Sequence, residues 1–248
     1  SPAMTRILAC ATVALALLAA PLRADIAMGV IAPSGELTAH KLWSALAERL
    51  SADLGEPVTL HPLGTAALDE AYHAGELDIM LTNPVQSAIA HHKGGALIAS
   101  LEKSSGKQLA GVIVAHPDAG IVEVADLRGK RLITPPMRSA GAFICPAALA
   151  IEHGVGIPAD MAEHEIGKNQ LDLIRLVANG VFDVAFVRSG MVERMIEAGG
   201  VATSDVVIVN EQAHPGFPHR ASTKLYPEWY MVGAPGLSPA AATRIRAA

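Results

Sequence analysis

The chain has 248 residues, of which 51% are hydrophobic and 17% charged, and its formal charge is -5. A disordered chain is excluded, because disorder requires low hydrophobicity and high net charge. A nucleic-acid-binding protein is disfavoured as well, since it would carry a basic excess. The length suits one large domain or two small ones, with enough residues for an ample core.

Residues 1–24 are expected to be a tag remnant followed by a secretory signal peptide. Met4-Thr5-Arg6 is a short positive segment, and residues 7–18 are apolar. That apolar run is shorter than the roughly 18 residues that favour a membrane-spanning helix. A retained N-terminal anchor stays open as the alternative.

Export would leave Cys145 as the one cysteine of the mature chain, so no internal disulfide is expected.

Strand and helix patterns alternate along the rest of the chain. Short apolar runs bounded by Gly, Pro or Asn predict strands at residues 25–32, 57–61, 77–81, 96–101, 109–116, 130–133, 182–187 and 206–209. Apolar residues at helical spacing predict helices at residues 36–54, 65–73, from Pro84, 140–153, 169–178, 191–197 and from Pro239. Alternation of this kind is typical of parallel sheets with right-handed crossovers.

Two similar units occur within this pattern. Residues 74–79 and residues 178–184 each end a helix with a tight turn and then begin a strand that carries an Asp. We therefore expect an α/β fold of two lobes joined by a hinge, a clamp that closes around a ligand. Lobe one is predicted to comprise residues 25–115 and 217–248, and lobe two residues 116–216. A single doubly wound sheet is the alternative.

The loops after the predicted strands are rich in small and hydroxyl side chains, and several of them begin a helix. Ligands of open α/β sheets bind at this edge, and unpaired N–H groups at helix N-termini favour an anion. Hydroxyl or cationic groups that could contribute are Ser34, Thr82, Arg138, Ser139, Lys168 and Arg188. Each loop alone is explained by N-capping, so convergence of several loops on one cleft is the feature that would favour binding.

The order and spacing of several segments resemble the phosphate/phosphite/phosphonate family of periplasmic binding proteins. The segments are residues 42–58, 74–79, 124–131 and 176–180. In addition, residues 217–229 (FPHRASTKLYPEW) resemble a motif in the periplasmic sensor domain of tetrathionate-sensor-type histidine kinases.

This resemblance implies a non-catalytic periplasmic domain of the type II-like binding-protein fold that binds a small anion between its lobes. The domain would signal to a downstream membrane helix and kinase module of an inner-membrane protein. A solute-binding protein of a phosphonate/phosphate-type ABC transporter is the alternative.

The resemblance also implies a set of ligand contacts, to which charge and position add Arg138 and His219. Together the expected ligand-binding residues are Thr82, Asn83, Arg138, Ser139, Ala140, Gly141, Lys168, Arg188, Ser189 and His219. The chain departs from phosphonate binders in having only one hydroxyl residue in the loop of residues 137–141 and a basic Arg188 in place of an acidic residue. These departures favour a fully ionised anion, such as a sulfur oxyanion or a carboxylate.

Cys145 lies one turn into the predicted helix 140–153, where the helix N-terminus would lower its pKa and allow a redox role or a thiol-dependent enzyme. A buried core cysteine is the competing interpretation. The sequence contains no HExxH, CxxC, GxSxG, Walker or dinucleotide-binding motif, and its ten histidines are scattered. We therefore expect no metal, no cofactor and no catalysis. The aromatic residues of the tail, including Trp229, are expected to form a satellite core against lobe one, and an aromatic ligand cage is the alternative.

Overall fold

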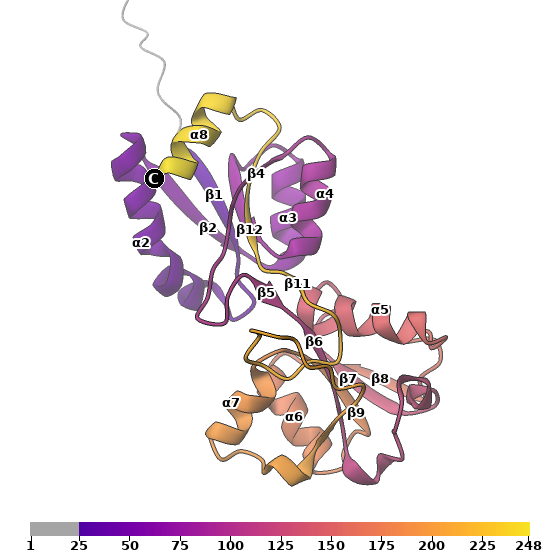
Figure 1. Cartoon of the computed structure of the whole chain (residues 1–248). Helices are drawn as coiled ribbons and strands as arrows, with labels where there is room; N and C mark the ends of the chain where they lie inside the picture. Colours follow the sequence, from indigo (N-terminus) through magenta and orange to yellow (C-terminus); the bar gives the residue numbers. More distant parts are fainter. Residues whose placement is uncertain (1–24) are drawn as a thin grey trace, which may run out of the picture.

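The computed structural model of the chain describes residues 25–248, so the predicted tag remnant and signal peptide lie outside the described residues. Two five-stranded sheets, each covered by helices, form two lobes (Figure 1). The predicted two-lobed α/β fold is confirmed, and the alternative of a single doubly wound sheet is wrong. Within residues 25–248, no helix has the length and hydropathy that a membrane span requires.

The first sheet has the strand order β2-β1-β3-β12-β4. Its strands are β1 (Ile26–Ile31), β2 (Val58–Leu63), β3 (Ile79–Thr82), β4 (Ala96–Ser100) and β12 (Tyr230–Gly233). β1 pairs in parallel with β2 and β3, whereas β12 runs antiparallel between β3 and β4. The tail therefore does more than the expected docking through aromatic residues, because it supplies an inner strand of this sheet.

Four helices cover the first sheet: α2 (Glu36–Leu54), α3 (Thr65–His73), α4 (Pro84–His92) and α8 (Pro239–Ala247). α2 and α8 lie on one face and α3 and α4 on the other (Figure 1). Gly55 directly follows α2 as its C-cap, and its positive φ of 68° suits a residue without a side chain. Leu50 and Leu54 of its apolar stripe are buried, but Leu42 is 64% exposed.

The second sheet has the strand order β10-β6-β9-β7-β8. Its strands are β6 (Gly111–Ala115), β7 (Arg131–Thr134), β8 (Glu163–Ile166), β9 (Val184–Arg188) and β10 (Val207–Ile208), and its helices are α5 (Cys145–Glu152), α6 (Gln170–Ala178) and α7 (Met191–Glu197). β7 is parallel to β8 and β9, and β6 is antiparallel to β9 and β10.

The predicted helix 140–153 is divided into a π-helical turn, Ala140–Ile144, and α5. Pro146 accounts for this division, because it has no N–H group for a regular helical bond.

A short two-stranded sheet lies where the chain passes between the lobes (Figure 1). It pairs β5 (Gln108–Leu109) with β11 (Tyr226–Pro227) in antiparallel fashion. The predicted limits of the lobes stay a prediction. Because β6 pairs within the second sheet, we propose that the two crossings lie at β5 and β11.

Candidate functional site

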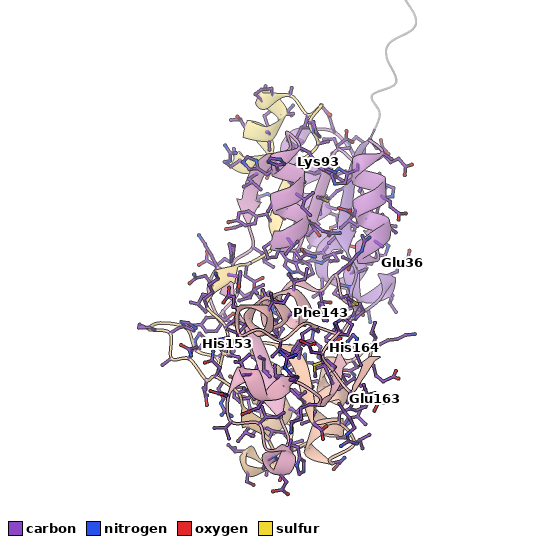
Figure 2. All side chains as sticks on the ribbon, turned by 90° about the vertical axis from the view of Figure 1, so that its right-hand side faces the viewer. Glu36, Lys93, Phe143, His153, Glu163 and His164 are labelled. Carbon is purple, nitrogen blue, oxygen red and sulfur yellow. The ribbon has the colours of Figure 1, made fainter. Side chains whose placement is uncertain are left out.

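A cavity of about 650 Å³ lies between the two lobes, and we call it the inter-lobe cleft. Its wall combines the loop after β1 and the start of α3 with the loop after β7, the start of α6 and part of α7. The wall residues are Pro33, Ser34, Thr65, Pro135, Pro136, Ser139, Lys168, Asn169, Gln170, Leu171, Met191 and Arg194. Figure 2 shows Glu36, the first residue of α2, at the edge of the upper lobe that faces the lower lobe.

The first lobe presents a helix N-terminus without a side-chain cap to the cleft. α3 begins at Thr65, and its N-cap Gly64 has no side chain that could accept from the first N–H groups. The first turn of α3 also has no acidic side chain. Unpaired N–H groups and the helix dipole at this end favour a negatively charged ligand.

The side chains of the cleft wall have a net positive charge. Lys168 and Arg194 are exposed, and neither makes an ion pair with another residue of the described chain. Among residues 25–248, none with a carboxylate side chain lines the wall. The other polar residues of the wall carry hydroxyl or amide groups and are Ser34, Thr65, Ser139, Asn169 and Gln170. A small anion would therefore find cations and hydrogen-bond donors in the cleft without a repelling charge.

Of the residues expected to bind ligand, Ser139 and Lys168 line the cleft. Ser139 precedes the π-helical turn, and its side chain makes no capping hydrogen bond there. Ala140 and Gly141 are buried behind it. A Cβ atom on Gly141 would lie 2.9 Å from Leu109 Cδ1, so glycine permits the π-helical turn to pack against β5.

Thr82 and Asn83 are buried and do not line the cleft. Thr82 is connected to the cleft wall through Gln86. Thr82 donates a hydrogen bond to Gln86 Oε1, and Gln86 Nε2 donates to the Thr65 carbonyl oxygen at 2.7 Å. Asn83 caps α4 by accepting from the N–H groups of Val85 and Gln86. Its Nδ2 is buried without a partner among residues 25–248. The Thr82–Gln86 contact therefore helps to fix the start of α3 at the cleft.

Arg188 and Ser189 are not part of the cleft wall. Their side chains instead contact residues near β5 and β11, the short strands between the lobes. Arg188 Nη2 donates to Glu228 Oε1, and Lys103 Nζ lies 3.5 Å from the same oxygen. Glu228 is fully buried. Ser189 Oγ accepts from Ala110 N at 3.1 Å. The charge of Arg188 is therefore compensated by Glu228. The sequence did not indicate this role of Glu228.

Arg138 and His219 also have partners outside the cleft wall. Arg138 Nη1, from the loop after β7, lies 3.9 Å from Asp69 Oδ2 on α3, so this ion pair joins the two lobes. His219 Nδ1 lies 3.9 Å from Glu193 Oε1 on α7, and its ring packs over Gly190.

Cys145 has the environment of a core residue. Its side chain is buried at 3% exposure, and burial raises the pKa of the thiol to about 12, with Lys224 opposing the shift. These features favour the core interpretation over a redox role, because the thiolate is the reactive form. No group of three or more His, Cys, Asp or Glu side chains in the described part of the chain could hold a metal ion.

Arg194, Thr65 and Gln170 also line the cleft but were not among the predicted ligand contacts. Met191 and Arg194 are three residues apart on α7 and therefore share a helix face. Because α7 follows β9 at the same sheet edge as the predicted loops, this spacing is the signal that could have found Arg194.

A family model for the periplasmic substrate-binding proteins of phosphonate ABC transporters matches residues 28–248. The chain belongs to this family. It is a periplasmic substrate-binding domain of the phosphonate-binding type, and the family is one of binding proteins and not of enzymes. The predicted family resemblance is confirmed.

The chain is also similar to the tetrathionate sensor histidine kinase TtrS of Salmonella typhimurium, with 26% identity over 225 residues. The match covers 88% of this chain but only 38% of that kinase, so the chain spans well under half of this relative.

Two solved structures share its fold. The binding-protein component of a phosphonate ABC transporter from Pseudomonas aeruginosa has a TM-score of 0.67 and 16% identity, with 90% of this chain and 72% of that chain covered. PhnD1 from Prochlorococcus marinus, in complex with methylphosphonate, has a TM-score of 0.67 and 14% identity, with 90% and 82% covered.

Proposed function

We propose that this chain is the ligand-sensing part of a histidine kinase and that a small anion binds in the inter-lobe cleft. The observation that carries the proposal is the cleft wall, which has two unpaired cations and an uncapped helix N-terminus but no carboxylate. The similarity to a tetrathionate sensor histidine kinase supports the signalling role. Sulfur oxyanions are therefore the first candidates. Arg188 no longer supports this preference, since its charge is compensated by Glu228.

The crossing segments offer a route from the cleft to a downstream module. Ligand would favour the conformation in which the lobes lie close together. The segment through β11 continues into β12 inside the first sheet, and α8 follows it. Rotation of the lobes would therefore move this segment, and the following membrane helix and kinase module would receive the change at the membrane.

A solute-binding protein of a phosphonate- or phosphate-type ABC transporter is the second candidate, and the family membership favours it. The gene distinguishes the two proposals. A downstream apolar span of about 20 residues followed by a kinase would exclude the transporter role.

A thermal-shift panel tests anion binding. The panel contains tetrathionate, thiosulfate, sulfite, phosphate, methylphosphonate and succinate, with chloride as the baseline. A ligand at a hundred times its Kd stabilises the folded protein by about 2.7 kcal/mol, which raises the Tm of a chain of this size by roughly 5–10 °C. We expect at least one anion to give such a shift. A panel without any shift would contradict the proposal.

A further inference from the structure

A second cavity, of about 290 Å³, adjoins the inter-lobe cleft beside the N-terminal half of α2, and we call it the side pocket. The two cavities share Pro33 and Ser34 of the loop after β1 in their walls. The side pocket thus opens beside the place where an anion would lie.

The wall of the side pocket is almost entirely apolar. Both tryptophans of the chain, Trp43 on α2 and Trp229 before β12, line it, together with Leu42 and Leu101. Leu42 belongs to the apolar stripe of α2 but is 64% exposed. Apolar surface of this kind gains free energy when a ligand removes it from water, and ligand sites are ordinarily apolar with a few polar groups that fix orientation.

Lys103 is the one charged residue of this wall, and it has partners in the protein. Its ammonium group lies 3.5 Å from Glu228 Oε1 and 5.9 Å from the centre of the Trp229 ring. Burial lowers the pKa of Lys103, and the nearby Arg188 adds to this effect. Because the ammonium group is engaged by Glu228, the side pocket offers a ligand apolar walls and not a second free cation.

We propose that the side pocket is a subsite for the uncharged, apolar substituent of an organic anion whose charged group lies in the inter-lobe cleft. The inference rests on the proposed function and narrows the ligand class to organic sulfonates, phosphonates or carboxylates with an alkyl or aryl group. The volume suits a single ring, since an apolar cavity of about 150 Å³ is enough for benzene.

Isothermal titration calorimetry with matched pairs of anions tests the proposal. Benzenesulfonate is compared with methanesulfonate, and phenylphosphonate with methylphosphonate, so that each pair shares its charged group. We expect the phenyl member to bind roughly ten- to thirtyfold more tightly, because it buries apolar area that the methyl member lacks. Tryptophan fluorescence should change with the phenyl member only, since both tryptophans line the side pocket.

Two exposed leucines of α2 provide a matched pair of variants. Leu42→Gln should reduce the preference for the phenyl member at least threefold, because Leu42 lines the side pocket. Leu37→Gln is the control, because Leu37 is 70% exposed and not part of that wall. Both substitutions are at exposed positions, so both variants should fold.

The outcomes separate the two proposals. Equal affinity for both members of each pair would refute the subsite and leave anion binding in the cleft intact. Tighter binding of ethane-1,2-disulfonate than of benzenesulfonate would also refute it, because Lys103 would then be serving a second anionic group. Failure of every organic and inorganic anion to bind would overturn the proposed function and the subsite with it.

Discussion

Four basic residues of the second lobe, Arg138, Lys168, Arg188 and Arg194, differ in the partners of their side chains. Arg188 is held by the buried Glu228, and Arg138 lies 3.9 Å from Asp69 across the lobes. Lys168 and Arg194 face the cleft without an ion pair among the described residues. Cations without an ion pair are therefore a better guide to the proposed anion site than the number of basic residues in a loop.

Burial of Cys145 predicts an unreactive thiol. With a pKa of about 12, roughly one molecule in ten thousand carries a thiolate at pH 8, compared with about one in ten for an unfolded chain. Because the folded-state pKa lies above the unfolded value, this group stabilises the fold below pH 9, and the contribution is lost as the pH rises toward 12. Ellman's reagent should therefore react at least a hundredfold more slowly with the native protein than with protein in guanidinium chloride. Equal rates would contradict the buried position.

At the scale of elements, the segment from residue 222 to β12 connects most of the features described above. It pairs as β11 with β5, supplies Glu228 to Arg188 and Lys103, supplies Trp229 to the side pocket, and then becomes an inner strand of the first sheet. Residues 217–229, which resemble the sensor-kinase motif, thus overlap the part of the chain that contacts both lobes and lines the side pocket.

Glu228→Gln should destabilise the protein strongly. The substitution leaves Arg188, at 19% exposure, and Lys103 beside each other without their carboxylate. Removing one partner of a buried ion pair costs about 3–5 kcal/mol of unfolding free energy. Urea denaturation measures the loss.

Glu102→Gln is the matched control, because Glu102 is an exposed partner of Lys107 at 3.4 Å. An exposed pair of this kind contributes about 0–1 kcal/mol. If both variants lost the same stability, Glu228 would not have the structural role assigned to it.

At the scale of the whole molecule, the relative position of the lobes depends on two crossings and on contacts across the cleft. β5 pairs with β11 at the proposed crossings, and the Arg138–Asp69 ion pair joins the loop after β7 to α3. The side chain of Arg138 is 59% exposed, so solvent screens this pair. We therefore interpret it as a weak contact of the conformation with closely placed lobes.

Arg138→Ala should lower anion affinity by no more than about fivefold, because an exposed ion pair contributes about 1 kcal/mol or less. The effect should disappear when Asp69→Ala is already present, which a double-mutant cycle in calorimetry measures. A complete loss of binding in both backgrounds would instead mean that Arg138 contacts the anion directly, as the sequence analysis expected.

The sequence predicted the fold where local patterns determine it. The bounds of α2 and α3 were predicted correctly, because helical spacing and flanking glycines are local signals. β8 was missed because three of its four residues, Glu163–Glu165, are polar and the strand lies at a sheet edge. β12 was missed because its place in the sheet depends on pairing with β3 and β4, which lie far away in the chain.

Local sequence patterns also predicted part of the candidate site. Ser139 lies in the loop after a predicted strand, so the carboxyl-edge rule finds it, and Lys168 was predicted because it immediately precedes the predicted helix 169–178. The pairing of Arg188 with Glu228 joins residues 40 positions apart, and no local pattern indicates it. Arg194 lies on α7, at the sheet edge of the predicted loops, and its position in the cleft wall also depends on the placement of the two lobes opposite each other.

Removal of the two free cations tests anion binding between the lobes most directly. Calorimetry with the tightest-binding anion of the thermal-shift panel would compare the wild type with Lys168→Ala, Arg194→Ala and the double variant. Lys93→Ala is the control, because Lys93 is an exposed lysine at the far end of the upper lobe (Figure 2). Each cleft variant should lose about ten- to a hundredfold in affinity and the double variant should not bind measurably, since a hydrogen bond to a charged group contributes about 1.5–3 kcal/mol. Wild-type affinity in the double variant would contradict an anion site in the inter-lobe cleft.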